Sequence, residues 1–249
     1  MKIHVTHIGT ATVLLEVGPL KILTDPVFGG AKHFHFGAGM TSDHTRGPWV
    51  PASEVPPPDL VLLSHDQHAD NLDDEGRAVI ANCTNVFSTP AASKRMKAVG
   101  LRDFESKTVG EVKITAMPAR HGPPLTGAIT GPCIGFVLEW PGQSNGPLYI
   151  SGDTVLFDGA LEVARRFKIG TAFLHLGAAG YGPLRFTMNA DEGAQLGKAL
   201  GAKTLIPLHY EDWTHFKQPR SEVTPAFERA GLGHRLTWLE PGKRTELEV

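Results

Sequence analysis

Short apolar segments rich in β-branched residues recur along the whole chain. Such segments suit strands that are buried on one or both faces of a sheet. Only brief turns separate the first three, so we expect them to form an antiparallel meander. The predicted strands cover residues 2–8, 12–17, 20–25, 60–64, 85–89, 112–118, 133–140, 147–152, 171–177 and 204–209.

Helical periodicity enters only in the second half of the chain. Residues 154–170 place apolar side chains on one face of a helix, with Gly170 as a stop. Residues 188–203 begin with Asn189 as a candidate N-cap, and Glu192 follows at the capping-box spacing. A strand-dominated first half and an alternating second half predict an α/β fold. We expect one domain over residues 1–249.

Composition and charge exclude several classes of function. Apolar residues make up 41% of the chain and charged residues 20%, with a net charge of −2 and no basic stripe of the kind that nucleic-acid binders use. No apolar stretch approaches the roughly 20 residues of a membrane span. The two cysteines form no C-x-x-C pair, which suits a reducing cytoplasm. The sequence therefore predicts a cytoplasmic protein with a small-molecule partner, and leaves a homo-oligomer open.

Side chains of metal-ligand type follow the carboxyl ends of four predicted strands. The segment His65-Asp66-Gln67-His68-Ala69-Asp70-Asn71 follows the strand at 60–64, and His121, Asp153 and His209 follow later strands. Loops at these ends are where α/β folds place ligands and catalysts. One histidine there is usually an ordinary loop residue, and Asp153 alone could cap a helix. The coincidence of four such ends favours a site for Zn²⁺, Mn²⁺ or Fe²⁺.

Several motifs extend this pattern over nearly the whole chain and in a consistent order. They are "HIGTATVLLE", "ILTDPVF", "LLSHDQHADNLD", "RHG", "YISGDT", "FTMNADEG" and "IPLHY". Together they resemble the metallo-β-lactamase superfamily. The nearer likeness is to its branch of ascorbate-phosphate lactonases and the phospholipase D that cleaves N-acyl-phosphatidylethanolamine.

The resemblance implies a four-layer αββα sandwich with one or two divalent metals, Zn²⁺ or Mn²⁺, between two sheets. It implies that His65, His68 and His121 hold one ion. Asp70, the residue at position 71 and His209 would hold the second, with Asp153 bridging both. Asp70 would also act in catalysis by orienting a water molecule whose pKa the metal lowers to about 7. His175 and Tyr210 are the expected substrate contacts.

The chain departs from the superfamily motif H-x-H-x-D-H-L-D inside "HDQHADNLD". Aligned from its end, the motif puts Asp66 in the first histidine position. Aligned from the preceding strand, it puts His65 there, so the turn contains an inserted residue. We favour His65 and keep Asp66 as the alternative. Asn71 replaces the last histidine with a neutral amide, which predicts weaker binding at the second site or a preference for a harder ion.

These expectations predict a metal-dependent hydrolase that uses an activated water on an ester, lactone, amide or phosphodiester bond. One alternative is a non-catalytic metal- or ligand-binding domain with a degenerate site. A di-iron redox protein of the same fold is another, although the chain has no flavin module. We further expect the loop at 28–50, with Phe34, Phe36 and Trp49, to cover the groove beside the metals.

Overall fold

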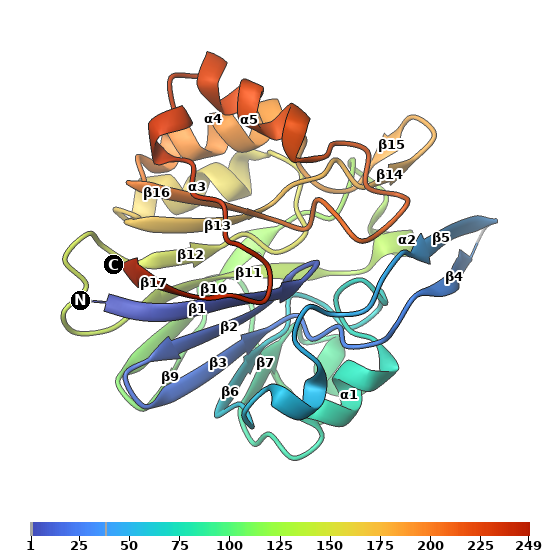
Figure 1. The fold of residues 1–249 in the computed structure, drawn as a ribbon, viewed down its shortest axis with the longest axis horizontal. Helices are drawn as coiled ribbons and strands as arrows, with labels where there is room; N and C mark the ends of the chain where they lie inside the picture. The colour runs from blue at the N-terminus through green and yellow to red at the C-terminus, as the bar shows by residue number, and fades with distance from the viewer. Residues whose placement is uncertain (1, 38) are drawn as a thin grey trace.

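The computed structural model describes residues 2–37 and 39–249, which form two facing β-sheets with helices outside them (Figure 1). The first sheet has seven strands in the order β17-β1-β2-β3-β6-β7-β8. The strands β1, β2 and β3 form the predicted antiparallel meander, and β6 then joins in parallel. Their bounds are Lys2–Gly9 for β1, Thr12–Val17 for β2, Leu20–Thr24 for β3, Leu60–Leu62 for β6, Val86–Ser88 for β7, Val99–Gly100 for β8 and Arg244–Glu248 for β17.

The second sheet has six strands in the order β16-β13-β12-β11-β10-β9. The strands β9 to β12 pair antiparallel, whereas β13 and β16 continue in parallel. The carboxyl ends of β12, β13 and β16 therefore lie along one edge. The bounds are Ser106–Val109 for β9, Val112–Ala119 for β10, Cys133–Glu139 for β11, Leu148–Ile150 for β12, Thr171–His175 for β13 and Thr204–Leu208 for β16.

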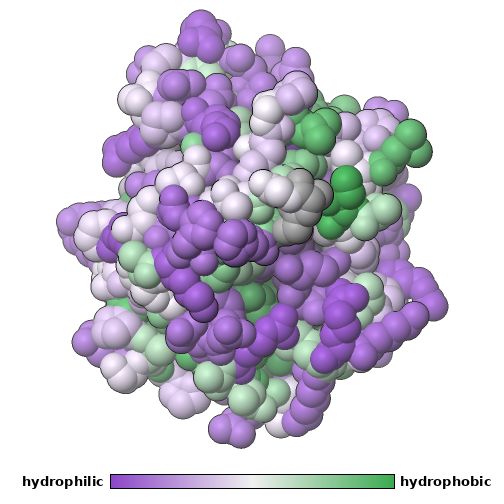
Figure 2. Space-filling model, turned by 90° about the vertical axis from the view of Figure 1, so that its right-hand side faces the viewer, coloured by the Kyte–Doolittle hydropathy of each residue, from purple (hydrophilic) through white to green (hydrophobic). Residues whose placement is uncertain are grey.

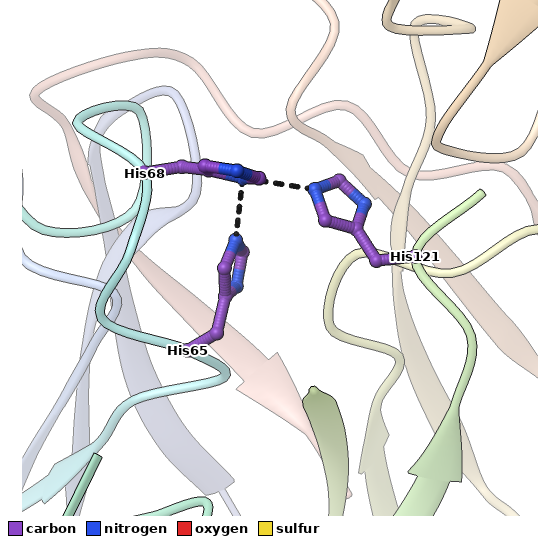
Figure 3. Close-up of side chains that lie close together, drawn as sticks. All are labelled: His65, His68 and His121. Atoms are coloured by element: carbon purple, nitrogen blue, oxygen red, sulfur yellow. Dashed lines mark hydrogen bonds between the residues drawn. The ribbon is translucent and has the colours of Figure 1, made fainter. Parts of the chain in front are cut away.

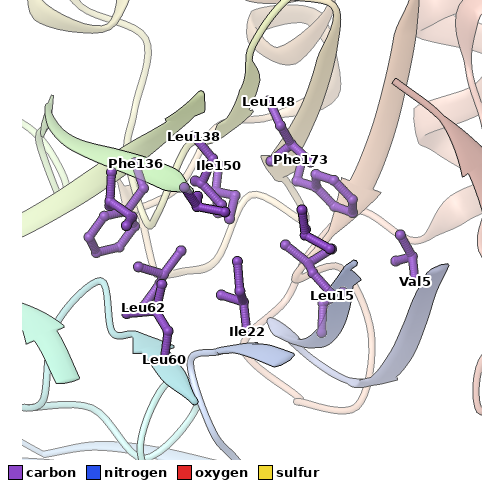
Figure 4. Close-up of a cluster of buried hydrophobic side chains, with 14 of the residues drawn as sticks. Val5, Leu15, Ile22, Leu60, Leu62, Phe136, Leu138, Leu148, Ile150 and Phe173 are labelled. Carbon is purple, nitrogen blue, oxygen red and sulfur yellow. The ribbon is translucent and has the colours of Figure 1, made fainter. Parts of the chain in front are cut away.

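The main hydrophobic core lies between the two sheets. Leu15, Ile22 and Leu62 of the first sheet face Phe136 and Phe173 of the second (Figure 4). These side chains are buried, and burying each such side chain contributes about 1.5–3 kcal/mol. This core sets the two sheets face to face and fixes the edge where the strand ends meet.

Helices cover the outer faces of both sheets, which completes the four-layer αββα sandwich. Helices α3 (Asp158–Arg166), α4 (Ala190–Leu200) and α5 (Arg220–Arg229) pack on the second sheet, and α1 (Asp74–Ile80) packs on the first. The short helix α2 (Gly127–Thr130) and the hairpins β4–β5 and β14–β15 gather at one end of the sandwich, on the right of Figure 1. The hairpin strands are Lys32–Gly37, Met40–His44, Gly180–Tyr181 and Leu184–Arg185. None of the helices within the described ranges is long and apolar enough to cross a membrane.

The predicted strands are all present, but the predicted helices differ in detail. Helix α3 begins at Asp158 rather than near residue 154, because Thr154 and Val155 hydrogen-bond the backbone of Arg120. Asn189 caps α4 by accepting from the Glu192 amide at 2.8 Å. The Glu192 carboxylate does not complete the capping box, since it pairs with Arg185, whose Nη2 lies 2.7 Å from Glu192 Oε1.

Candidate metal centre

The turn between β6 and α1 presents the histidines of the "HDQH" segment. Asp73 anchors the end of this turn, because its carboxylate accepts from the Gly76 amide at 2.6 Å and from the Gly29 amide at 2.6 Å. At the other end, the Ser64 amide donates to Asp25 Oδ1 at 2.7 Å. Buried hydrogen bonds therefore fix the turn on both sides, and the residues between them have little freedom to change direction.

His65 and His68 point toward His121, which follows β10 (Figure 3). His65 Nε2 lies 3.1 Å from His68 Nδ1, and His121 Nε2 lies 3.0 Å from the same atom. The three rings have ligand atoms within 4.8 Å of one another. Two nitrogen ligands of one tetrahedral zinc lie about 3.3 Å apart, so this group has the dimensions of a metal site.

The hydrogen bonds behind these rings set which nitrogen is free. His121 Nδ1 lies 3.0 Å from the Phe186 carbonyl, which can only accept, so Nδ1 carries the proton. Burial lowers the pKa of His121 to about 4, so the ring is neutral and its Nε2 presents a lone pair. One nitrogen of His68 cannot donate to two neighbours at once. A shared cation satisfies all three nitrogens better than hydrogen bonds do.

Asp66, the alternative to His65, faces away from this group. Its carboxylate forms a two-point ion pair with Arg95, at 2.8 Å between Nε and Oδ2. Arg77 also donates to the Asp66 carbonyl at 2.8 Å. The inserted residue thus bulges the turn so that His65 keeps the strand-end position and Asp66 serves the surrounding structure.

A second group lies beside the three histidines and consists of Asp70, Asp153 and His209. His209 Nε2 lies 3.3 Å from Asp70 Oδ2 and 3.4 Å from Asp153 Oδ2, yet neither contact has hydrogen-bond geometry. Asp153 Oδ2 is also 3.9 Å from His121 Nε2. One carboxylate oxygen of Asp153 therefore faces both groups, which is the position of a bridging ligand.

Several buried polar atoms here lack a hydrogen-bond partner within the described residues. Asp153 Oδ2, Asp70 Oδ1 and both ring nitrogens of His209 belong to this set. Leaving buried charged groups unpaired costs several kcal/mol. A divalent metal would satisfy carboxylate and imidazole atoms together, so the donor set fits the metals that the sequence predicts.

The electrostatics of the second group keep its carboxylates ionised. Burial alone would raise the pKa of Asp153 and Asp70, but neighbouring histidines hold both pKa values well below the usual range. The same carboxylates raise the pKa of His209 although burial opposes this. Negative charge is thus concentrated where a cation would bind.

Local backbone geometry aims two of these residues. His209 directly follows β16 and has a left-handed φ of 58°, while its amide donates to the Thr10 carbonyl at 2.9 Å. Such a conformation is strained for a residue other than glycine. Gly152 precedes Asp153 with a φ of 61°, and a Cβ there would lie 2.4 Å from the Ile134 carbonyl oxygen. Only glycine fits that approach.

Asn71 lies in the same buried region. Its Nδ2 donates to Ser64 Oγ at 3.3 Å, and Ser64 Oγ is also 3.0 Å from His65 Nδ1. Asn71 Oδ1 is buried without a hydrogen-bond partner among the described residues. The amide therefore supports His65 through Ser64, and its role as a metal ligand stays a prediction.

The two expected substrate contacts lie away from open space. His175 is fully buried and its Nδ1 is 2.9 Å from Asp153 Oδ1, which places it behind the second group. Tyr210 is buried against the ring of Trp238, with centroids 5.0 Å apart. Neither lines the pocket above the two groups. Both residues therefore lie where they can support the site, and a substrate contact from either one stays a prediction.

A pocket with a free volume of about 40 Å³ opens above His68, Asp70 and His121. Its walls include Phe36 and Met40 of the β4–β5 hairpin, so the predicted loop does lie beside the site. Sequence reasoning missed His215, Tyr181 and Phe186 as lining residues, although His215 follows His209 closely in "HYEDWTHF".

The end of the molecule that carries the pocket also exposes apolar side chains (Figure 2). Leu125 and Ile129 lie at or beside α2 with exposed fractions of 98% and 57%, and Leu184 of β15 has 41%. The surroundings of the pocket are therefore partly apolar as well.

Comparison with known proteins places this chain in a family. A β-lactamase superfamily domain profile matches residues 21–210. A metal-dependent hydrolase of Pelotomaculum thermopropionicum is 32% identical over 98% of this chain and 99% of its own. The chain belongs to the β-lactamase superfamily. This confirms the predicted superfamily and its metal-dependent hydrolase class, and it sets aside the non-catalytic alternative.

Two solved structures share the fold of this chain. The isothiocyanate hydrolase from Delia radicum gut bacteria superposes with a TM-score of 0.80 at 22% identity, covering 98% of each chain. A metallo hydrolase from Ignicoccus hospitalis gives 0.71 at 20% identity and covers 100% of each chain. The narrower likeness to the lactonase and phospholipase branch stays a prediction.

Proposed function

We propose that this protein hydrolyses a small, uncharged substrate at an electrophilic carbon, using a centre of two divalent metals. The observation that carries the metal centre is Asp153 Oδ2, which lies 3.9 Å from His121 Nε2 and 3.4 Å from His209 Nε2 without a hydrogen-bond partner in the described chain. His65, His68 and His121 would hold one ion, and Asp70, Asp153 and His209 the other.

The chemistry divides between the ions and the chain. When bound, divalent ions supply Lewis acidity and make water a competent nucleophile near neutral pH. Asp70 lines the pocket and is kept ionised, so its carboxylate can orient a water molecule by accepting a hydrogen bond from it. Phe36 and Phe186 form apolar walls beside these groups.

The walls of the pocket support an uncharged substrate. Its described lining residues are apolar or aromatic side chains together with Thr130 and the polar residues of the site, and none of them is lysine or arginine. Phosphate-binding sites usually supply a cation or a cluster of backbone amides to the anion. A phosphodiester, one of the bonds predicted from sequence, would therefore have only the bound metals to balance its negative charge, with no lysine or arginine among these lining residues to assist them.

Candidate bonds are esters, lactones and amides, all of which present a neutral carbonyl carbon. The structural likeness to an isothiocyanate hydrolase adds another small neutral electrophile, the central carbon of an N=C=S group. Apolar walls suit the hydrocarbon part of such a substrate. We therefore place isothiocyanates beside carbonyl compounds in the substrate panel.

The test compares substrates that share one leaving group. The zinc-loaded protein is assayed with p-nitrophenyl acetate, p-nitrophenyl butyrate and bis(p-nitrophenyl) phosphate, and separately with phenethyl isothiocyanate. We expect a neutral substrate to have a kcat/KM at least about 100-fold above that of the phosphodiester, which corresponds to about 2.7 kcal/mol.

Two variants make the comparison specific. His121→Ala should abolish hydrolysis of the preferred substrate, because it removes a ligand from the first group. His234→Ala alters an exposed histidine far along the chain and should leave the rate unchanged. Faster hydrolysis of the phosphodiester, lost in His121→Ala, would overturn the proposed substrate class.

A further inference from the structure

His215 connects the β4–β5 hairpin to Asp70. Its Nε2 lies 3.1 Å from Asp70 Oδ2, and its Nδ1 lies 2.7 Å from Ser42 Oγ of β5. The side chain is buried, with an exposed fraction of 7%. These contacts join segments that are 145 and 173 residues apart in sequence.

The chemistry of the partners orients this chain of hydrogen bonds. The Asp70 carboxylate can only accept, so His215 Nε2 carries the proton and donates to it. In the neutral ring, Nδ1 then accepts from the Ser42 hydroxyl. The aromatic rings of Tyr181 and Phe216 lie 5.7 Å and 4.7 Å from the imidazole and limit its rotation.

Asp70 has little other support. Across residues 2–37 and 39–249, His215 provides the one hydrogen bond in good geometry that reaches its carboxylate, and Asp70 Oδ1 has none. The nearby Asn71, which stands where the superfamily motif has a histidine, instead donates to Ser64. The direction of the Asp70 carboxylate therefore depends on a residue outside the motif.

We propose that His215 is a positioning residue for the second metal and that Ser42 holds it in place. The β4–β5 hairpin would then serve two purposes, because Phe36 on β4 forms the pocket wall while Ser42 on β5 stabilises a metal ligand. Loss of hairpin contact would weaken metal binding as well as open the pocket. This proposal rests on the proposed second metal site.

The test is a double-mutant cycle read as zinc affinity, measured by competition with a chelator. Groups that orient metal ligands typically change metal affinity 10–100-fold when they are removed. We expect His215→Ala to weaken the second zinc by about that factor and Ser42→Ala to weaken it several-fold. The double variant should bind no more weakly than His215→Ala alone, since both act through one chain of contacts.

Matched variants separate positioning from general damage. The affinity of the first zinc, at the three-histidine group, should stay unchanged in every variant and reports an intact fold. His215→Gln should restore most of the second affinity, because its amide can both donate to Asp70 and accept from Ser42. Thr41→Ala, at the exposed neighbouring position on β5, should have no effect.

The outcomes also distinguish this proposal from the one on which it rests. Wild type that binds no second zinc would overturn the dinuclear centre, and the positioning role with it. Two zinc ions in the wild type, with an unchanged second affinity in His215→Ala, would overturn the positioning role alone. Additive effects of Ser42→Ala and His215→Ala would refute the coupling to the hairpin.

Discussion

His175 Nδ1 lies 2.9 Å from Asp153 Oδ1, and both side chains are fully buried. The ring also stacks on His209, with centroids 5.4 Å apart and planes 10° from parallel. Because Oδ1 of Asp153 is engaged by His175, its Oδ2 is the oxygen left to face both metal groups. This geometry makes His175 a support for the bridging carboxylate.

Replacing His175 should therefore weaken metal binding. We expect His175→Ala to lower zinc affinity about 10–100-fold, as removal of groups behind metal ligands typically does. With saturating zinc, KM should change little. A raised KM with unchanged zinc affinity would instead support the substrate contact that the sequence predicts.

The ion pair of Asp66 with Arg95 leads to a contrasting pair of variants. The Asp66 side chain is 2% exposed and that of Arg95 is 45% exposed. Asp66→Ala should lower the free energy of unfolding by about 1–3 kcal/mol, through lost hydrogen bonds to a charged group, and leave zinc content intact. His65→Ala should lose zinc. Denaturation and metal analysis of the two variants decide whether His65 or Asp66 is the metal ligand. Zinc loss in Asp66→Ala would show that Asp66 is a ligand.

The residues that converge on the site were predictable because each one ends a buried strand. His68, His121, Asp153 and His209 come directly after or close to strands whose apolar pattern is clear, and parallel or paired strands bring such ends to one edge. The direction of Asp66 was not predictable. It depends on Arg95, which has no periodic relation to the turn.

His215 and the β4–β5 hairpin show where sequence patterns fail. The phenylalanines of β4 pack against residues from a distant part of the chain, since the ring of Phe34 lies 4.9 Å from that of Trp213 and the ring of Phe36 lies 5.7 Å from that of His215. The local pattern does not identify these partners, so the sequence predicts only a loop here. The contact of Ser42 with His215 spans 173 residues. Only the assembled fold brings such pairs together.

Phe36 should determine the size of substrate that the pocket accepts. Its ring lies 5.9 Å from that of His68 and 5.7 Å from that of His215. Phe36→Ala should raise KM for an ester with a short acyl chain by several-fold, because it loses apolar contact worth about 1 kcal/mol or more. The variant should accept esters with longer acyl chains better than the wild type does. A series of p-nitrophenyl esters measures this.

The control for Phe36 is Trp49→Ala, which removes an aromatic ring with an exposed fraction of 49% that does not line the pocket. It should leave the chain-length preference unaltered. If Phe36→Ala behaved like Trp49→Ala, the hairpin would have no part in selectivity.

Asp25 should make the stability of the metal-free protein depend on pH. Burial raises the pKa of Asp25 from 3.8 to about 8. Between these values the folded chain keeps a proton that the unfolded chain releases, so the Asp25 contribution to stability falls as pH rises from about 4 to 8. Asp25→Asn removes this dependence. It also preserves the acceptor for the Ser64 amide and tolerates the positive φ of 31°.

Denaturation of both proteins at several pH values gives the difference in unfolding free energy. The free energy of unfolding of Asp25→Asn should rise relative to that of the wild type as the pH increases from about 4 to 8. A difference that stays constant from pH 4 to 8 would show that Asp25 is ionised in the folded protein.

The most direct test of the dinuclear centre is zinc stoichiometry at equilibrium for wild type and Asp153→Asn. We predict two zinc ions in the wild type, the tighter one at His65, His68 and His121, because position 71 offers the other site only a neutral amide. Asp153→Asn should lower the zinc affinity of both sites, since Asp153 Oδ2 faces both groups. A single zinc whose affinity Asp153→Asn leaves unchanged would contradict the account.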